Sequence, residues 1–152
     1  MATLHLLVGL PGSGKTTRAK EIEAAGAFRL SPDEWMARIV GDGYDAERRE
    51  AVHAVQWEIA QRLLTLGVDV VLEFGFFRRS ERDAFRDGGL TLGANVRTEF
   101  LEAPRDELLR RLSLRNADLP PDTFPVSEEH LDLCISWFEP PTADELERPG
   151  SV

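Results

Sequence analysis

The sequence feature that most constrains this fold is one short motif, Gly9-Leu10-Pro11-Gly12-Ser13-Gly14-Lys15-Thr16. The motif follows an apolar run at residues 4–8 and precedes a segment of helical character at residues 17–25. Its pattern, G-x-x-x-x-G-K-[ST], is that of a phosphate-binding loop, in which glycines let backbone N–H groups turn toward a phosphate. The order of strand, loop and helix is the context that this motif requires. The chain is therefore expected to bind a nucleotide at this point.

The loop and the start of the following helix divide the binding of a nucleotide between backbone and side chains. Lys15 supplies a positive charge to the β- and γ-phosphates, and Thr16 supplies a hydroxyl to Mg²⁺. The N-terminus of the helix adds its partial positive charge. The residues assigned to nucleotide binding are Gly9, Pro11, Gly12, Ser13, Gly14, Lys15, Thr16 and Thr17. ATP and Mg²⁺ are the expected cofactors, and the sequence leaves the choice between ATP and GTP open.

Size and charge limit the classes of protein to which the chain can belong. Its 152 residues, 42% of them hydrophobic, are enough for one domain with a core. A net charge of −9 argues against an extended nucleic-acid surface, because such binding depends on Lys and Arg. The N-terminus lacks a basic leader and the apolar runs are too short to span a bilayer, so we expect a cytoplasmic protein without membrane contact. Cys134, the single cysteine, is expected to be a buried thiol, and the sequence carries no signal of oligomeric state.

Apolar segments with strand character alternate with segments of helical periodicity along the chain. We expect strands at residues 4–8, 27–30, 68–74 and 95–101, and helices at 17–25, from 31, at 45–66, from 80, at 104–116 and at 127–138. This alternation predicts the α/β class and a P-loop NTPase three-layer sandwich with a mostly parallel central sheet. Gly88-Gly89 and Gly93 are expected to interrupt the helix that starts at Ser80.

Two acidic residues follow strands at the edge where open α/β sheets bind ligands. Asp33 lies just past the second strand, in a helix start that Ser31 caps. It either complements the dipole of that helix or acts on a substrate, and chemistry alone makes the two roles about equal. Glu73 lies near the end of the third strand, where a carboxylate can hold a magnesium-bound water or orient a catalytic group. Because a buried charge needs such a partner, we assign Glu73 to the metal site with Thr16.

The long helix expected at residues 45–66 has two faces. Apolar residues at helical spacing predict its core face: Val52, Val55, Ile59, Leu63 and Leu66. A second stripe, at intervals of four, contains Arg49, His53 and Trp57. The favoured interpretation of this stripe is a half-buried boundary with packed aromatic rings. The alternative is that His53 and Trp57 line an acceptor pocket.

Arginines occur at two places near the expected site. Arg78 and Arg79 follow the third strand, and Arg110-Arg111 to Arg115 lead into a proline-rich segment at residues 119–125. Arginines spaced by four on a surface helix are usually solvated. Because the same chain contains a phosphate loop, we expect at least one of these arginines to contact a phosphate. We therefore count Arg78 and Arg79 among the candidate substrate residues, and the later arginines as part of a lid.

Several of these features together resemble the small P-loop kinases classed with AAA-type ATPase domains. That group includes polynucleotide 5′-hydroxyl kinases, chloramphenicol phosphotransferase and zeta-type toxins. The resemblance rests on the phosphate loop, on Ser31-Pro32-Asp33-Glu34, on Val71-Leu72-Glu73-Phe74 and on the Arg111-x-x-x-Arg115 spacing, and it extends to about Asn116. It implies that Asp33 activates the acceptor hydroxyl and that Arg111 and Arg115 belong to a lid over the phosphates.

Two positions depart from the pattern of those kinases. The third strand of the relatives often ends in aspartate, whereas this chain has Glu73, whose side chain is longer by one methylene. Polynucleotide kinases carry an arginine one helical turn after the catalytic aspartate, where this chain has Met36. The second departure, like the negative net charge, argues against a nucleic-acid substrate.

The resemblance and the residues together predict a kinase. We expect a single P-loop kinase-like domain at residues 1–141, with an arginine-bearing lid around 110–125 and an acidic C-terminal tail at 142–152 that frays. It would transfer the γ-phosphoryl group of ATP to a hydroxyl of a small-molecule acceptor. The residues assigned to catalysis are Lys15, Asp33, Arg111 and Arg115. The alternatives are a polynucleotide 5′-hydroxyl kinase and a nucleotide-dependent switch or binding ATPase that has no acceptor.

Overall fold

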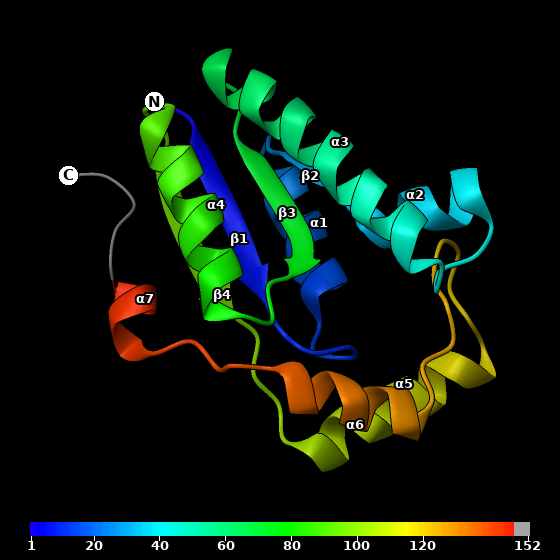
Figure 1. Ribbon diagram of the computed structural model, residues 1–152. Coiled ribbons are helices and arrows are strands. Elements are labelled where there is room, and N and C mark those ends of the chain that lie inside the picture. The colour runs from blue at the N-terminus through cyan, green and yellow to red at the C-terminus, as the bar shows by residue number, and fades with distance from the viewer. Residues whose placement is uncertain (148–152) are drawn as a thin grey trace.

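Four parallel strands form the central sheet. They are β1 (Thr3–Val8), β2 (Phe28–Leu30), β3 (Val70–Gly75) and β4 (Asn95–Phe100), and their order in the sheet is β2-β3-β1-β4. The computed structural model describes residues 1–147. Because every strand pair is parallel, the carboxyl ends of all four strands lie at one edge of the sheet, the lower edge in Figure 1.

Helices cover both faces of this sheet (Figure 1). On one face lies α1 (Lys15–Ala24), and on the other lie α3 (Ala46–Thr65) and α4 (Arg79–Thr91). Beyond the carboxyl edge lie α5 (Arg105–Ala117) and α6 (Glu128–Trp137). The short elements are α2 (Pro32–Trp35), the π-helical turn η1 (Met36–Val40) and α7 (Ala143–Glu147). The layers of helix, sheet and helix confirm the predicted α/β sandwich.

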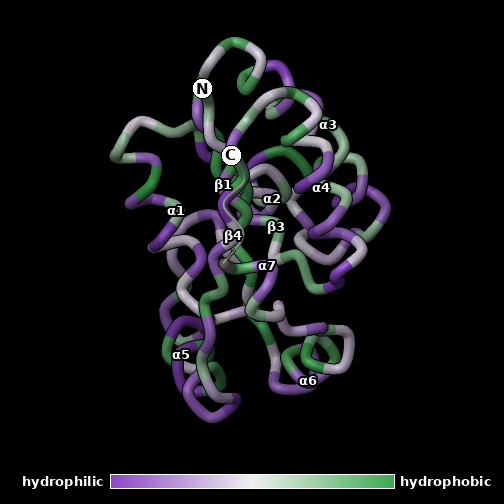
Figure 2. The backbone as a smooth tube through the Cα atoms, turned by 90° about the vertical axis from the view of Figure 1, so that its left-hand side faces the viewer, coloured by the Kyte–Doolittle hydropathy of each residue, from purple (hydrophilic) through white to green (hydrophobic). Residues whose placement is uncertain are grey.

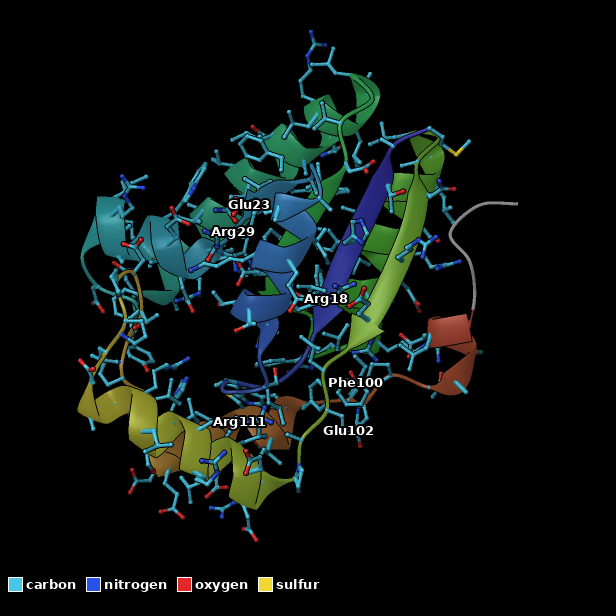
Figure 3. All side chains as sticks on the ribbon, turned by 180° about the vertical axis from the view of Figure 1, so that it is seen from behind. Arg18, Glu23, Arg29, Phe100, Glu102 and Arg111 are labelled. Atoms are coloured by element: carbon cyan, nitrogen blue, oxygen red, sulfur yellow. The ribbon has the colours of Figure 1, made fainter. Side chains whose placement is uncertain are left out.

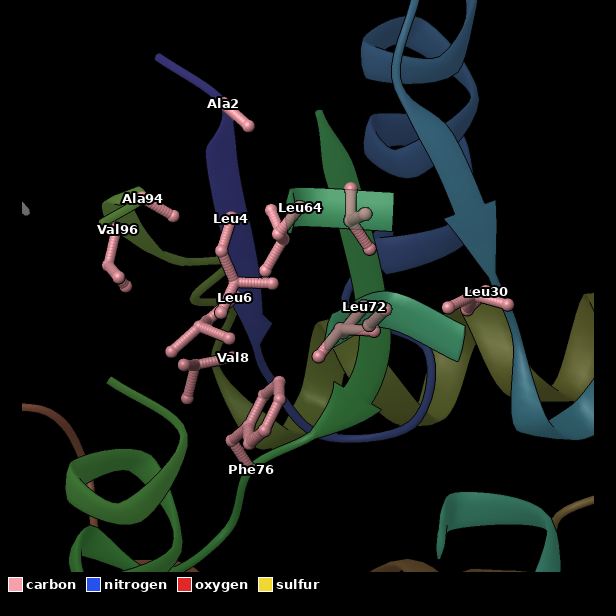
Figure 4. Close-up of a cluster of buried hydrophobic side chains, with 12 residues drawn as sticks. Ala2, Leu4, Leu6, Val8, Leu30, Leu64, Leu72, Phe76, Ala94 and Val96 are labelled. Carbon is pink, nitrogen blue, oxygen red and sulfur yellow. The ribbon is translucent and has the colours of Figure 1, made fainter. Parts of the chain in front are cut away.

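Three buried clusters hold these elements together. The largest lies between the sheet and the α3–α4 layer and includes Leu4, Leu6, Val8, Leu72 and Phe76 (Figure 4). A second lies under α1 and consists of Leu7, Ala19, Ile22, Ala27 and Val71. A third joins α5 to α6 through Leu108, Leu112, Val126 and Leu131. Hydrophobic stretches accordingly follow the central strands in Figure 2, whereas hydrophobic and hydrophilic residues alternate along α5 and α6.

Helix starts follow the capping residues of the sequence. The Ser31 hydroxyl accepts a hydrogen bond from the Glu34 backbone N–H at 3.3 Å, and Pro32 is the first residue of α2. Asp45 caps α3 in the same way, through a bond from the Arg48 N–H at 3.0 Å. The Ser31 cap places Asp33 in the first turn of α2, at the carboxyl end of β2.

The buried face of α3 differs from the predicted one. Its buried row is Val52, Gln56, Ala60 and Leu64, at intervals of four. Val55 and Leu66 of the predicted core face are 45% and 62% exposed, while Ile59 and Leu63 are only partly buried. A glutamine can occupy the centre of this row because its Nε2 donates to the Ser31 carbonyl at 3.1 Å. The sequence pattern missed the row because one of its members is polar and another is a small alanine.

The glycines of α4 do not interrupt it, contrary to expectation. Gly88 and Gly89 lie inside the helix. A Cβ on Gly88 would come within 2.8 Å of Trp57, and one on Gly89 within 2.8 Å of Val96, so these glycines allow α4 to lie close to its neighbours. Gly93, with φ of +80°, follows the end of the helix.

The start of the expected C-terminal tail forms a helix, whereas the sequence predicted that it frays. Residues 143–147 form α7, and Glu145 on that helix pairs with the buried Arg82 of α4 at 2.7 Å. The expected fraying therefore does not hold for this part of the tail, and residues 148–152 lie outside the described residues. Cys134 is buried, as expected. Within residues 1–147, no helix combines the length and the apolar character needed to cross a bilayer.

Candidate active site

The carboxyl edge of the sheet gathers the predicted site residues from distant parts of the chain. The phosphate loop follows β1, α2 follows β2, and Glu73 lies near the end of β3. Helix α5, which carries Arg111 and Arg115, lies across this edge (Figures 1 and 3). The ends of three parallel strands and one helix thus meet around the loop, as is usual for ligand sites in open α/β sheets.

The phosphate loop has the backbone that its glycines predict. Gly12 and Gly14 have φ values of +83° and +98°, a region that other residues rarely adopt. Gly12 also lies against α5, because a Cβ there would be 3.0 Å from Leu112 Cγ. The loop is therefore shaped by its own glycines on one side and by α5 on the other.

Lys15 points back to the loop that carries it. Its Nζ donates to the carbonyl oxygens of Gly9 at 2.8 Å and Leu10 at 3.0 Å. Burial lowers the pKa of Lys15 to about 8, although the charges of Asp33 and Glu73 act to raise it. The Lys15 ammonium group is thus held beside the loop with too little nearby negative charge to offset the cost of its burial. A bound triphosphate would supply negative charge there.

The donor set at Thr16 and Glu73 fits a magnesium ion. The Thr16 hydroxyl donates to Glu73 Oε1 at 2.8 Å, which brings two hard oxygen groups together next to the phosphate loop. Magnesium prefers such oxygens and is commonly held by one or two protein groups together with phosphates and water. Among the described residues there is no cluster of three or more His, Cys, Asp and Glu side chains arranged around a metal.

Asp33 is accessible and lies among charged groups. Its side chain is 59% exposed, and its Oδ1 accepts a hydrogen bond from Arg49 Nη2 at 2.7 Å. Arg49 also donates to the Gly43 carbonyl at 2.8 Å, which fixes the guanidinium between α3 and the preceding turn. The charge of Asp33 acts to raise the pKa of both Lys15 and Arg115, so the carboxylate is within electrostatic range of the loop and of α5.

Arg111 and Arg115 are both near the loop, in different environments. Arg111 Nη1 donates to the Gly12 carbonyl at 3.3 Å, and its Nε donates to Glu107 at 2.9 Å. Burial lowers the pKa of Arg115, and its Nε is a buried nitrogen without a hydrogen-bond partner among residues 1–147. Because a buried guanidinium N–H is costly without an acceptor, Arg115 is the arginine more in need of an anionic ligand.

The second stripe of α3 is mostly a packed boundary. The Trp57 ring packs on Phe85 with ring centroids 4.7 Å apart, which agrees with the favoured interpretation of a packed boundary for this residue. The His53 ring stacks on Phe74 at 4.4 Å. Burial, with Arg49 as the second cause, lowers the pKa of His53 to about 4, so the ring is neutral at pH 7.

The arginines after β3 are placed differently from Arg111 and Arg115 of α5. Arg79 donates to Thr142 Oγ1 at 2.9 Å and pairs with Asp144 at 3.0 Å, so it binds the C-terminal segment and not the phosphate loop. Arg78 occupies the N-cap position of α4. Arg79 thus contacts residues 142–145, and its predicted role toward substrate stays a prediction.

A mainly apolar cavity of about 190 Å³ adjoins the outer side of the phosphate loop. Its walls come from the loop, from Phe100 at the end of β4 and Glu102 just after it (Figure 3), and from Phe138 and Pro140. Ser13 lines this cavity, and its hydroxyl is buried with no hydrogen-bond partner in the part of the chain that the structure describes. The lining is thus mainly apolar, with Ser13 and Glu102 as its polar residues.

Comparison with known families agrees with this geometry. A profile described as the AAA domain matches residues 4–141, which is most of the chain. The chain belongs to the AAA domain family. No curated protein matches this AAA domain.

Solved structures, a gluconokinase among them, have the same fold as this chain. A chain of the Pnkp1/Rnl/Hen1 RNA repair complex superposes with a TM-score of 0.72, at 20% identity, over 90% of this domain and 43% of that chain. A gluconokinase from Sinorhizobium meliloti gives 0.64, at 22% identity, over 94% and 78%. Kti12 from Chaetomium thermophilum, in complex with ADP-AlF3, gives 0.71, at 17% identity, over 91% and 81%. The AAA domain spans 38% and 43% of two chains from the repair complex, less than half of their length. These likenesses show a P-loop kinase-like fold.

Sequence reasoning missed two arginines of the site. Arg29 of β2 pairs with Glu73, and Arg49 of α3 pairs with Asp33, both at 2.7 Å. A signal existed for Arg29, because a charged residue in a short strand between apolar neighbours needs a partner. The position of Arg49 on α3 gave no indication of its contact with Asp33, which depends on how α2 and α3 pack.

Proposed function

We propose that this AAA domain is an ATP- and Mg²⁺-dependent kinase that transfers the γ-phosphoryl group to a hydroxyl of a small-molecule acceptor. The observation that carries the proposal is the position of Asp33, whose charge acts on Lys15 of the phosphate loop and on Arg115 of α5. An accessible carboxylate thus lies near cations suited to a triphosphate. Transfer to a hydroxyl needs this combination of a base and positive charge.

Asp33 is the base in the proposed step. The acceptor hydroxyl gives its proton to the Asp33 carboxylate while its oxygen forms a bond to the γ-phosphorus. The bond between the γ-phosphorus and the bridging oxygen to the β-phosphate breaks, and ADP leaves with that electron pair. Arg49, 2.7 Å from Asp33 Oδ1, orients the carboxylate.

The cations of the site supply charge stabilisation. Lys15 would exchange its two carbonyl contacts for the β- and γ-phosphates. Arg111 and Arg115 would face the transferred group from α5, where an arginine is worth about three orders of magnitude or more in rate in related reactions. Thr16 and Glu73 would hold Mg²⁺, which neutralises charge on the β- and γ-oxygens when it is bound.

The first test is a search for the acceptor. Purified protein is incubated with ATP, Mg²⁺ and a pool of hydroxyl-bearing metabolites, antibiotics and a 5′-hydroxyl oligonucleotide, and products are identified by mass spectrometry. We expect one small molecule to gain the mass of a phosphoryl group, and a Lys15→Ala variant purified in parallel to give no product. ATP binding without transfer to any pool member, and without stimulated hydrolysis, would contradict the proposal and favour a nucleotide-dependent switch.

A polynucleotide 5′-hydroxyl kinase is the second candidate. The likeness to a chain of an RNA repair complex supports it, and Arg49 supplies a cation at Asp33 where the sequence has Met36 in place of an arginine. The net charge of −9 opposes it. Transfer to the oligonucleotide that weakens steeply as salt increases would favour this candidate, because contacts with a polyanion release counterions.

A further inference from the structure

We propose that Arg29 is a positioning residue that holds the metal-site carboxylate of Glu73 and fixes it relative to the helix that carries Asp33. This inference rests on the proposed function, because it concerns the same magnesium and phosphate site. Arg29 does not contact the phosphate loop in any described hydrogen bond, so its role would be exerted through other residues (Figure 3).

Strand register brings Arg29 and Glu73 to the same face of the sheet. In the parallel pair of β2 and β3, Arg29 is the partner of Val71. Val71 packs under α1, and Glu73, two residues later on the same strand, points the same way. Both side chains therefore emerge on the α1 face, where Thr16 lies in the first turn of the helix. This placement follows from backbone pairing and does not depend on a flexible loop.

The two oxygens of Glu73 have different partners. Oε1 accepts from the Thr16 hydroxyl at 2.8 Å, and Oε2 accepts from Arg29 Nη1 at 2.7 Å. The Glu73 side chain is only 4% exposed, so few other groups can orient it. A buried carboxylate without such a partner would be costly and free to rotate. Arg29 thus leaves Oε1 directed at Thr16, the predicted metal side.

The same guanidinium also reaches α2 and α1. Arg29 Nη2 donates to Glu34 Oε2 at 2.7 Å, and its Nε lies 3.5 Å from a Glu23 oxygen at the end of α1. Glu34 is the neighbour of Asp33. One planar group therefore joins β3, α2 and α1, the three elements that carry Glu73, Asp33 and Thr16. A lysine has a single charged point and cannot reproduce contacts in three directions.

The experiment compares the magnesium dependence of nucleotide binding in Arg29→Gln and Arg29→Lys with that of the parent protein. A fluorescent ATP analogue is titrated at several Mg²⁺ concentrations and in EDTA, and melting temperature is recorded for each protein. Arg105→Gln is the matched control, because Arg105 also binds two carboxylates, Glu128 and Asp132, at 2.7–2.9 Å, but lies away from Glu73.

We expect Arg29→Gln to need about 10-fold or more Mg²⁺ for half-maximal effect, which is the usual size for residues that orient metal ligands. Its nucleotide affinity in EDTA should stay that of the parent, and Arg29→Lys should fall between the two. The control should keep the parental Mg²⁺ dependence. A lower melting temperature with unchanged Mg²⁺ dependence would overturn the proposal. If Arg29→Gln does not fold, Arg29→Lys decides, and parental Mg²⁺ dependence in that variant would also overturn it.

The Mg²⁺ dependence of nucleotide binding tests the role of Arg29, and phosphate transfer to an acceptor tests the kinase proposal separately. Binding of the analogue needs no acceptor, so the Mg²⁺ shift is measurable even if no hydroxyl compound is phosphorylated. Failure of the acceptor search with a clear Mg²⁺ shift in the Arg29 variants would remove the kinase proposal and retain the positioning role. Where turnover is found, the shift should also be present in the Mg²⁺ dependence of kcat.

Discussion

At the scale of single residues, the candidate site is a group of opposite charges held close together. Asp33 lies beside Arg49 and within range of Lys15 and Arg115. Such clusters shift protonation equilibria and fix side-chain directions, both of which are common at active sites. Changes of one charge at a time can therefore separate the roles of these residues.

Asp33→Asn tests the base. We expect turnover to fall about 10²- to 10⁴-fold, which is the usual contribution of a general base, with nucleotide affinity nearly unchanged. Asparagine keeps an oxygen for Arg49 but cannot take the proton. Steady-state kinetics with the identified acceptor gives turnover, and a binding titration gives affinity.

The control for this variant is Asp87→Asn, which neutralises an exposed carboxylate on α4. It should have the turnover of the parent protein. Parental turnover in Asp33→Asn would remove Asp33 from the mechanism.

Lys15 makes nucleotide binding dependent on pH. In the free protein burial lowers its pKa from 10.5 to about 8, so at pH 9 only about a tenth of the molecules carry the proton. The charge of a bound triphosphate favours the protonated form. We expect proton uptake on binding at pH 9, approaching one per nucleotide, and an affinity that falls as pH rises above 8. Calorimetry in buffers of different ionisation enthalpy measures this uptake.

Lys15→Arg should bind without that uptake, since an arginine stays protonated at pH 9. Proton uptake by Lys15→Arg equal to that of the parent would show that another group titrates.

The free energy of unfolding also depends on the protonation of Lys15, but it rises with pH where nucleotide affinity falls. The unfolded chain binds more protons than the free folded protein between pH 8 and 10.5, so Lys15 adds stability as pH rises through that window.

At the scale of elements, a buried ion pair joins the C-terminal helix to the sheet layer. Arg82 of α4 and Glu145 of α7 are 2% and 8% exposed and lie 2.7 Å apart. Arg82 also donates to the Phe76 carbonyl at 2.9 Å, in the segment just after β3. The pair therefore links α7 to α4 and, through Arg82, to the segment just after β3.

Glu145→Gln should lower the free energy of unfolding by about 3 kcal/mol or more, because it leaves the buried charge of Arg82 unbalanced. Chemical denaturation monitored by fluorescence measures the change. Asp83→Asn is the control, since Asp83 is half exposed and 3.6 Å from its partner Arg79. Its stability should stay near that of the parent. Equal stability of Glu145→Gln and the parent would mean that this ion pair does not stabilise the fold.

At the scale of the whole molecule, the site lies between two separately packed parts. The sheet and its helices have their own cores, and α5 with α6 has another, next to the phosphate loop through Leu10. Contacts between the parts at the loop include Arg111 with the Gly12 carbonyl. A ligand in the loop would bind to both parts and stabilise their arrangement.

A non-hydrolysable ATP analogue with Mg²⁺ should therefore raise the melting temperature in a concentration-dependent way. The expected stabilisation is about 2.7 kcal/mol at a hundredfold excess over Kd. Differential scanning fluorimetry measures the shift. Thr16→Val should lose the part of the shift that depends on Mg²⁺ and keep the part seen in EDTA. No shift at saturating nucleotide would contradict a nucleotide site in the loop.

The sequence by itself determined the fold class and the phosphate loop. Strand and helix positions follow from local apolar periodicity and from caps such as Ser31, and the loop needs its glycines and lysine at fixed spacing. The placement of Asp33 and Glu73 at one edge also follows from the sequence. Parallel strands joined by helices bring their carboxyl ends together whatever the details of packing.

Only the tertiary structure decided which residues complete the site. The contacts of Arg29 with Glu73 and of Arg49 with Asp33 join residues 44 and 16 positions apart, and they depend on strand register and helix packing. The buried row of α3, with Gln56 at its centre, was decided in the same way, because a polar residue is buried only where a distant acceptor meets it. Local sequence patterns do not identify such partners, because the stability of a long-range contact depends on two residues that are far apart in the sequence.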